Sequence, residues 1–128
     1  MTMKMSTRRP VFFNLAQIQM PVGALTSITH RITGIFLAAG VPVAIYILDL
    51  SLQSTQTYMK AVDLFDEWYF KVFAIIFIWA LAHHLLAGVR HLLSDIDVGS
   101  LLPAGRRSAW IVNSAGLAVA LVAAKILI

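Results

Sequence analysis

The segment SITHRITG at residues 27–34 carries polar side chains at the start of a long apolar run. An α-helix would put four of its residues on one face, at positions i, i+3, i+4 and i+7: Ser27, His30, Arg31 and Gly34. A hydroxyl and a guanidinium one turn apart can hold a carbonyl oxygen, and the guanidinium can stabilise negative charge that develops on a quinone during its reduction. The residue types also allow simpler roles, a helix N-cap for Ser27 and a cation that snorkels to the membrane surface for Arg31.

A second polar cluster, HHLLAGVRHLLSD at residues 83–95, holds the histidines other than His30. Helical spacing puts four of its residues on one face: His84, Ala87, Gly88 and His91. A b-type haem needs an axial imidazole and small residues where its flat ring lies, and His30, Arg31 and His91 would then be placed to meet its propionates. Zinc would usually need three or four ligands in a tight shell. From the residues alone, a haem site and a structural network of interhelical hydrogen bonds both stay open.

Three apolar segments are long enough to cross a membrane and to position these clusters: residues 29–48, 69–93 and 109–127. A membrane-spanning helix needs about 20 residues at about 1.5 Å rise each. Only 12% of the residues are charged, against roughly 25% in a soluble domain. The segments also lack the polar face of a soluble helical bundle. We therefore predict an all-α integral membrane protein, a single domain over residues 1–128 with three transmembrane helices.

The segments that flank these spans are shorter and more polar. We expect QIQMP at 17–21 to form a short interfacial helix that stops before Pro21. Pro42 lies in the middle of the first span and predicts a packing kink. Residues 49–68 are predicted to form a loop, and GSLLPAGRRS at 99–108 a turn-rich connector.

The distribution of lysine and arginine predicts the orientation of the chain. Cations at the N-terminal arm, the start of the first span and the second connection outnumber those on the other side: Lys4, Arg8, Arg9, Arg31, Arg90, Arg106 and Arg107 against Lys60, Lys71 and Lys125. By the positive-inside rule, the N-terminus lies inside and the first loop and the C-terminus lie outside. Both polar clusters then lie near the inner surface.

Composition argues against several classes of protein. The chain has no cysteine, which excludes disulfides, cysteine-bound zinc and an iron–sulfur cluster held by this chain. Its net charge is +4, but the cations are scattered among apolar runs, so we expect no nucleic acid partner. The outer halves of the spans lack a continuous polar path, which argues against a small transporter.

Four motifs occur together along the chain: RP…NL…I…MP at 9–21, SITHRITG at 27–34, H…GVRHLLSD at 84–95 and GRRSA at 105–109. In this order and spacing, and with three spans, the chain resembles the cytochrome b556 anchor subunit of succinate dehydrogenase, respiratory complex II. The resemblance covers nearly the whole chain, and the combination is specific although neither short histidine motif would be so alone.

The resemblance implies a heterotetramer in the membrane. A flavoprotein oxidises succinate, an iron–sulfur subunit carries the electrons inward, and two three-helix anchors bind one haem b and a ubiquinone. This chain would be one anchor, which shares the haem with a second anchor subunit and takes no direct part in binding succinate. A haem-free structural anchor and the anchor of a quinol:fumarate reductase are the alternatives. We expect a bacterial inner membrane rather than a mitochondrion, because no convincing presequence is visible.

The resemblance also implies roles for individual residues. His84 matches the axial haem iron ligand, with the second imidazole supplied by the partner anchor. The positions around the haem propionates match His30, Arg31 and His91. The quinone site matches Ser27 and Arg31, with apolar lining from Ile28 and Met20. His83 departs from the family's pattern and lies beside the expected iron ligand, for which it could compete. One step along a helix, however, turns it about 100° away from His84.

Overall fold

The computed structural model describes residues 19–128, which form four α-helices: α1 (Val22–Gln53), α2 (Thr55–Asp66), α3 (Trp68–Asp95) and α4 (Leu102–Leu127). This part of the chain contains no strand. The helices α1, α3 and α4 are long and apolar enough to cross a membrane. The predicted all-α architecture with three transmembrane helices is confirmed. Of the interfacial helix predicted at 17–21, residues 19–21 are not helical, and the rest lies outside the described residues.

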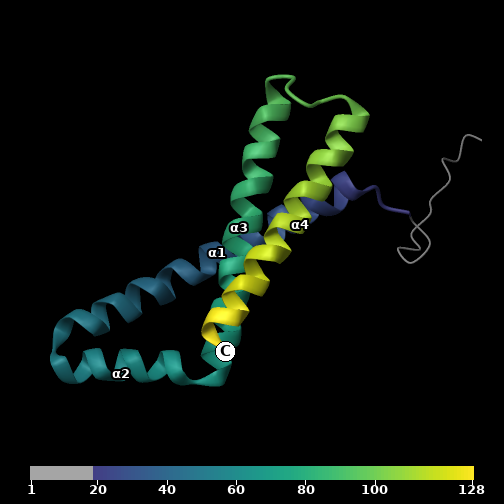
Figure 1. Ribbon diagram of the computed structural model, residues 1–128. Helices are drawn as coiled ribbons and strands as arrows, with labels where there is room; N and C mark the ends of the chain where they lie inside the picture. Colours follow the sequence, from purple (N-terminus) through teal and green to yellow (C-terminus); the bar gives the residue numbers. More distant parts are fainter. Residues whose placement is uncertain (1–18) are drawn as a thin grey trace, which may run out of the picture.

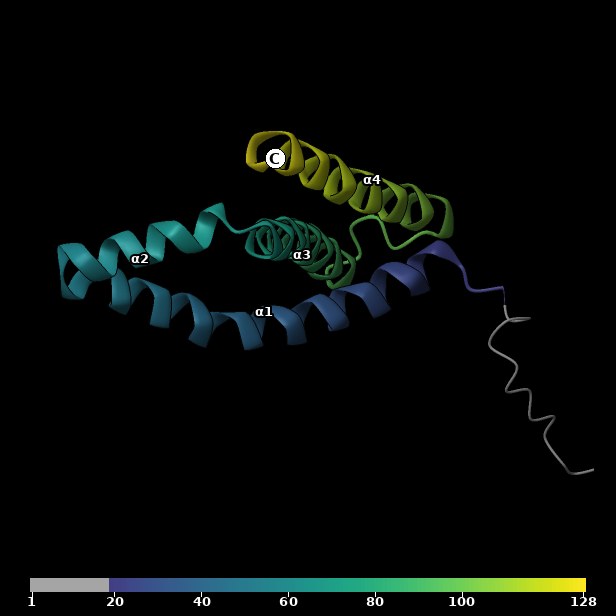
Figure 2. The ribbon, with the colours of Figure 1, turned by 90° about the horizontal axis from the view of Figure 1, so that it is seen from below.

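The central element is α3. It runs side by side with α4 in the opposite direction, while α1 crosses it and then separates from it toward the end where α2 joins the two (Figure 1). In the perpendicular view α3 lies between α1 and α4 (Figure 2). The contacts of α3 with both long helices are more extensive than those between α1 and α4. A side chain's direction around α3 therefore decides which neighbouring helix it meets.

Small residues form the buried seams between the long helices. Buried small positions recur seven residues apart: Thr26, Thr33 and Gly40 on α1, Ala80 and Ala87 on α3, and Ala109, Gly116 and Ala123 on α4. Membrane helices associate through close backbone packing and interhelical hydrogen bonds, because lipid removes the hydrophobic drive between them. At Gly40 the approach is closest, since a Cβ there would overlap the ring of Phe77. These seams bring the polar clusters of α1 and α3 together.

Large apolar side chains face outward along all three long helices. Ile35 on α1 is 73% exposed, Leu85 on α3 63% and Leu121 on α4 64%. In water this arrangement would be costly, but a bilayer solvates such side chains. The exterior is therefore apolar, while polar groups lie in the seams between helices.

The prediction of a loop over residues 49–68 is wrong, because most of this segment is helical. The helix α1 continues to Gln53, and α2 follows after one residue. Ser54 and Thr57 form a reciprocal capping box, in which Thr57 N donates to Ser54 Oγ at 3.1 Å and Ser54 N donates to Thr57 Oγ1 at 3.0 Å. These bonds satisfy two amides that a helix start otherwise leaves unpaired.

The connector predicted over residues 99–108 is shorter than expected. The helix α4 begins at Leu102 and has Pro103 in its first turn, where a proline's missing N–H costs nothing. The chain turns instead at Asp97, with φ of 62°, and Gly99, with φ of 74°. The helix α1 includes Pro42 and continues without interruption. Its path as a whole is curved (Figure 2).

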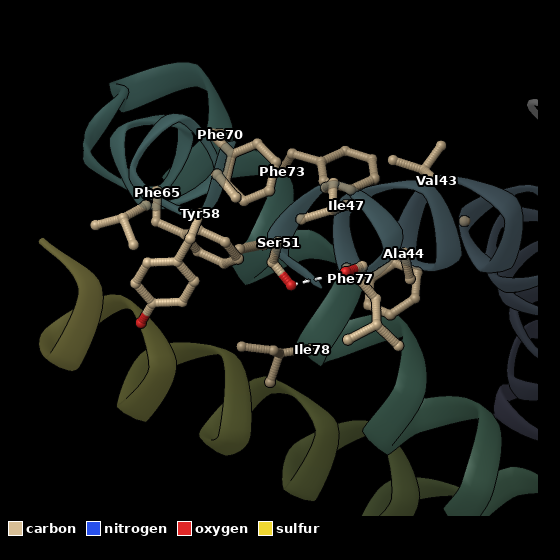
Figure 3. A pocket seen from close by; sticks show the side chains of 15 residues that line it. Val43, Ala44, Ile47, Ser51, Tyr58, Phe65, Phe70, Phe73, Phe77 and Ile78 are labelled. Carbon is tan, nitrogen blue, oxygen red and sulfur yellow. Dashed lines mark hydrogen bonds between the residues drawn. The ribbon is translucent and has the colours of Figure 1, made fainter. Parts of the chain in front are cut away.

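An apolar cavity of about 480 Å³ lies between α2, α3 and the C-terminal half of α1 (Figure 3). Phenylalanine rings of α3 form much of its wall: Phe70, Phe73 and Phe77. The hydroxyl of Ser51 donates to the carbonyl of Leu48 at 2.7 Å, which satisfies that donor within α1. None of the predicted haem or quinone residues lines this cavity, so it is separate from the polar cluster described next.

Candidate functional site

The backbone of α1 holds the imidazole of His84. Its Nδ1 lies 3.0 Å from the carbonyl oxygen of His30 and 3.3 Å from Oγ1 of Thr33. The Thr33 hydroxyl has carbonyl acceptors of its own, on Thr29 and His30, each at 2.9 Å. Because both neighbours of Nδ1 then act as acceptors, Nδ1 carries the hydrogen and Nε2 keeps a lone pair. Metal-binding histidines are oriented in this way, with the distal ring nitrogen bound to a backbone carbonyl.

Three of the histidines lie together where α1 crosses α3. The rings of His30 and His84 are stacked, with centroids 4.1 Å apart and 10° between their planes. The ring of His91 lies 5.2 Å from that of His30 at 58°. Stacked rings present their faces to each other rather than converging nitrogens, and residues 19–128 contain no group of three or more acidic or histidine side chains placed to hold a bare metal ion. The arrangement fits a single axial imidazole better than a zinc shell.

Gly34 permits this close stacking. A Cβ on Gly34 would lie 2.9 Å from Cε1 of His84, whereas carbon atoms in contact normally stay near 3.5–4.0 Å apart. A Cβ on Gly88 would lie 3.4 Å from Nε2 of His30, an ordinary contact. The sequence placed both glycines on the faces that carry the histidines, and the structure puts each against the histidine of the opposite helix.

The residues predicted to contact a quinone lie in the first turns of α1 and, for Met20, just before it. Met20 and Ile28 are each 40% exposed, Arg31 is exposed and Ser27 is half-buried. The single face expected for the first cluster is therefore divided. Its histidine faces α3, whereas its arginine faces the surroundings and is available to a ligand or another chain.

His83 belongs to a different cluster from His84. It is 2% exposed, and its Nε2 lies 3.1 Å from Oδ1 of Asn113 on α4. The same Oδ1 lies 3.2 Å from Oγ1 of the fully buried Thr26 on α1. The sequence reasoning missed the threonine and the asparagine, although an amide inside an otherwise apolar span is a signal of an interhelical hydrogen bond.

Arg90 fastens the start of α4 to α3. Its Nε donates to Oγ of Ser108 at 3.0 Å, and its Nη2 donates to the carbonyl of Gly105 at 3.3 Å. The Ser108 hydroxyl donates to the same carbonyl at 3.1 Å. This arginine therefore belongs to the scaffold around the histidines.

Comparison with known proteins agrees with this architecture. A family model described as "Succinate dehydrogenase/Fumarate reductase transmembrane subunit" matches residues 5–124. The chain is 34% identical over 110 residues to the succinate dehydrogenase cytochrome b556 subunit of Coxiella burnetii (strain RSA 493 / Nine Mile phase I), over 84% of this chain and 87% of that protein. It is also 34% identical over 113 residues to the succinate dehydrogenase cytochrome b556 subunit of Paracoccus denitrificans, over 87% of each chain. The chain therefore belongs to the succinate dehydrogenase/fumarate reductase transmembrane subunit family.

Proposed function

We propose that this chain is the haem b- and ubiquinone-binding membrane anchor of a succinate dehydrogenase, and that it delivers electrons from succinate oxidation to the quinone. Two relatives are named as cytochrome b556 subunits, and a cytochrome of the b type carries haem b. The observation that carries the proposal is the hydrogen bond from Nδ1 of His84 to the carbonyl of His30. It fixes the tautomer that offers Nε2 to an axial position.

The residues around His84 fit a haem. Haem b, when bound, supplies an iron centre that exchanges single electrons. His84 would hold the iron through Nε2, and the second axial imidazole would come from the partner anchor subunit. His30, Arg31 and His91 would meet the propionates, since cations and hydrogen-bond donors stabilise carboxylates.

The start of α1 would hold the quinone. The Ser27 hydroxyl and the Arg31 guanidinium lie one helical turn apart and would donate hydrogen bonds to a quinone oxygen. The guanidinium keeps its charge at any physiological pH, so it stabilises negative charge that develops on that oxygen during reduction. Ile28 and Met20, both partly exposed, would line the site with apolar surface.

The chain would act as part of a larger assembly. A flavoprotein subunit would oxidise succinate, and an iron–sulfur subunit would pass the electrons to the quinone at the inner surface. The excess of cations on that side supports an orientation in the bacterial inner membrane with the N-terminus in the cytoplasm and the C-terminus in the periplasm. The phospholipid bilayer would cover the apolar exterior that the partner anchor leaves open.

The haem assignment is tested by His84→Leu in the purified complex. We expect the reduced-minus-oxidised absorption spectrum to lose or shift its b-type bands, while an artificial dye still accepts electrons from succinate. An unchanged spectrum with full haem content would reject His84 as the ligand. A wild-type complex without haem but with normal quinone turnover would favour the haem-free anchor instead.

The quinone assignment is tested by Arg31→Leu, with Arg106→Leu as the matched control. Both variants remove one cation from the same predicted side, and both side chains are exposed. We expect Arg31→Leu to lower quinone reduction by about 10²-fold or more, the usual effect of losing a preorganised charge donor, and to spare dye reduction. Equal losses of the two activities, or equal effects of the two variants, would contradict the assignment.

The family description also names fumarate reductase. A quinol:fumarate reductase anchor would use the same residues in the reverse direction. Comparing succinate oxidation and fumarate reduction rates in the purified complex distinguishes the two.

A further inference from the structure

We propose that Thr26, His83 and Asn113 form a polar lock that sets the rotation of α1 and α3 about their own axes. Through this rotation the three residues would orient Ser27 toward the quinone and His84 toward the haem. This inference rests on the proposed function, because it concerns how the two proposed sites are positioned.

The lock joins all three long helices through one amide. Oδ1 of Asn113 on α4 lies 3.1 Å from Nε2 of His83 on α3 and 3.2 Å from Oγ1 of Thr26 on α1. His83 is 2% exposed and Thr26 is fully buried. Hydrogen bonds to such buried groups restrict rotation, because breaking one leaves a buried polar group without a partner.

The Thr26 hydroxyl lies within hydrogen-bond distance of two acceptors, the carbonyl of Val22 at 3.0 Å and Oδ1 of Asn113 at 3.2 Å. Because Oδ1 can only accept, its contact with His83 at 3.1 Å requires the ring hydrogen on Nε2. The other ring nitrogen of His83, Nδ1, then keeps a lone pair.

This Nδ1 has no hydrogen-bond partner within residues 19–128 and is buried. An unpaired buried nitrogen costs free energy that a leucine would avoid. Packing alone therefore does not account for a histidine at this position, whereas a need for the directional bond from Nε2 does.

Two of the lock residues, Thr26 and His83, stand directly before a proposed site residue. His83 precedes His84, and one residue turns the helix by about 100°. The first therefore points to α4 and the second to α1, where its Nδ1 meets the carbonyl of His30 at 3.0 Å. If α3 turned enough to release Asn113, the imidazole of His84 would also turn away from that carbonyl.

The helices α3 and α4 are in direct contact beside the lock. A Cβ on Gly116 of α4 would lie 3.4 Å from Cβ of His83, an ordinary van der Waals distance. On α1, Thr26 precedes Ser27 in the same way. Because Thr26 is held in the buried seam between the helices, Ser27 lies at the edge of that seam, where it is half-buried.

The test uses the assembled complex with Asn113→Leu and His83→Phe. Electron paramagnetic resonance of the oxidised haem reports the orientation of the axial imidazoles, and steady-state kinetics report the KM for ubiquinone. We expect both variants to retain haem but to change its resonance positions. We also expect the KM to rise by roughly 3- to 20-fold, the worth of one interhelical hydrogen bond in a membrane.

Three further variants make the result specific. His83→Gln places an amide near the position of Nε2 and is expected to restore both readouts toward wild type. Thr26→Val removes only the hydroxyl, keeps the shape, and is expected to raise the KM with a smaller change at the haem. Ser114→Ala removes an exposed hydroxyl beside Asn113 and is expected to change neither.

The outcomes separate the lock from the proposed function. Unchanged resonance and KM in Asn113→Leu and His83→Phe would overturn the lock, even if the complex became less stable. If those two variants did not assemble, the other two would decide. A wild-type resonance and KM in Thr26→Val, together with a resonance and KM in His83→Gln that differ from wild type, would overturn the lock. Failure of the proposed function would appear elsewhere, as an unchanged haem spectrum in His84→Leu.

Discussion

The imidazole of His84 meets His30 twice, once through its backbone and once through its side chain. Nδ1 of His84 is bound to the His30 carbonyl at 3.0 Å, and the two rings are stacked with centroids 4.1 Å apart. The first contact does not depend on the identity of residue 30, because every residue has a carbonyl. The second requires a flat ring.

This distinction predicts the result of His30→Leu. The variant keeps the carbonyl that orients His84 but removes the imidazole proposed to meet a propionate, so we expect the complex to retain its haem, with bands that shift less than in His84→Leu. It loses ring stacking worth about 0.5–1.5 kcal/mol, which a lower Tm of the complex measures. His84→Leu is the control that removes the proposed ligand itself. Haem loss in His30→Leu as large as in His84→Leu would contradict this reading.

Gly34 predicts a steric effect on the same imidazole. A Cβ there would lie 2.9 Å from Cε1 of His84, whereas one on Gly23 would lie 3.5 Å from Nη2 of Arg90. We expect Gly34→Ala to destabilise the complex by about 1–3 kcal/mol, as overpacking of a core does, and to shift the haem bands. Gly23→Ala adds the same methyl group at an ordinary van der Waals distance, so its spectrum is expected to match wild type. Equal spectra in the two variants would contradict the prediction, because they would mean that the added methyl group at residue 34 does not displace the imidazole of His84.

The long helices could be predicted because length and apolar composition are properties of the chain itself. The helix α2 was missed because it is short and carries charges such as Lys60 and Asp63. Its capping box at Ser54 and its apolar positions Tyr58 and Phe65 were the available signals. The start of α4 lies inside the predicted connector, because glycine, serine and proline together favour turns, although the first turn of a helix accepts a proline such as Pro103.

The division of the first polar cluster could not be predicted from periodicity. Spacing shows which residues share a face, but the face is wide and its direction depends on the neighbouring helix. Arg31 and His30 are adjacent in the sequence, but they face different surroundings. Arg31 is exposed, whereas the ring of His30 stacks on His84 of α3. The pairing of Thr26 with Asn113 spans 87 positions, and only the packing of three helices decides it.

The capping box predicts that α2 depends on Ser54. We expect Ser54→Ala to cost about 1 kcal/mol, because the amide of Thr57 loses its acceptor. Hydrogen exchange of the amides in α2 should become faster, while the haem spectrum stays unchanged. Thr55→Ala removes a neighbouring hydroxyl that takes no part in the box, and its exchange rates should match wild type. Slow exchange retained in Ser54→Ala would mean that packing alone holds α2.

Arg90 predicts an effect on stability without an effect on the site. Its guanidinium binds Ser108 at 3.0 Å and Gly105 at 3.3 Å in a forked arrangement, which a lysine cannot reproduce. Hydrogen bonds from a charged group contribute about 1.5–3 kcal/mol, so Arg90→Leu should lower the Tm of the complex and Arg90→Lys should recover little of it. Combined with Ser108→Ala, Arg90→Leu should cost less than the sum of the single changes, because both remove the same bond. Additive losses, or a changed haem spectrum in Arg90→Leu at a temperature where the complex is folded, would instead place this arginine in the binding machinery.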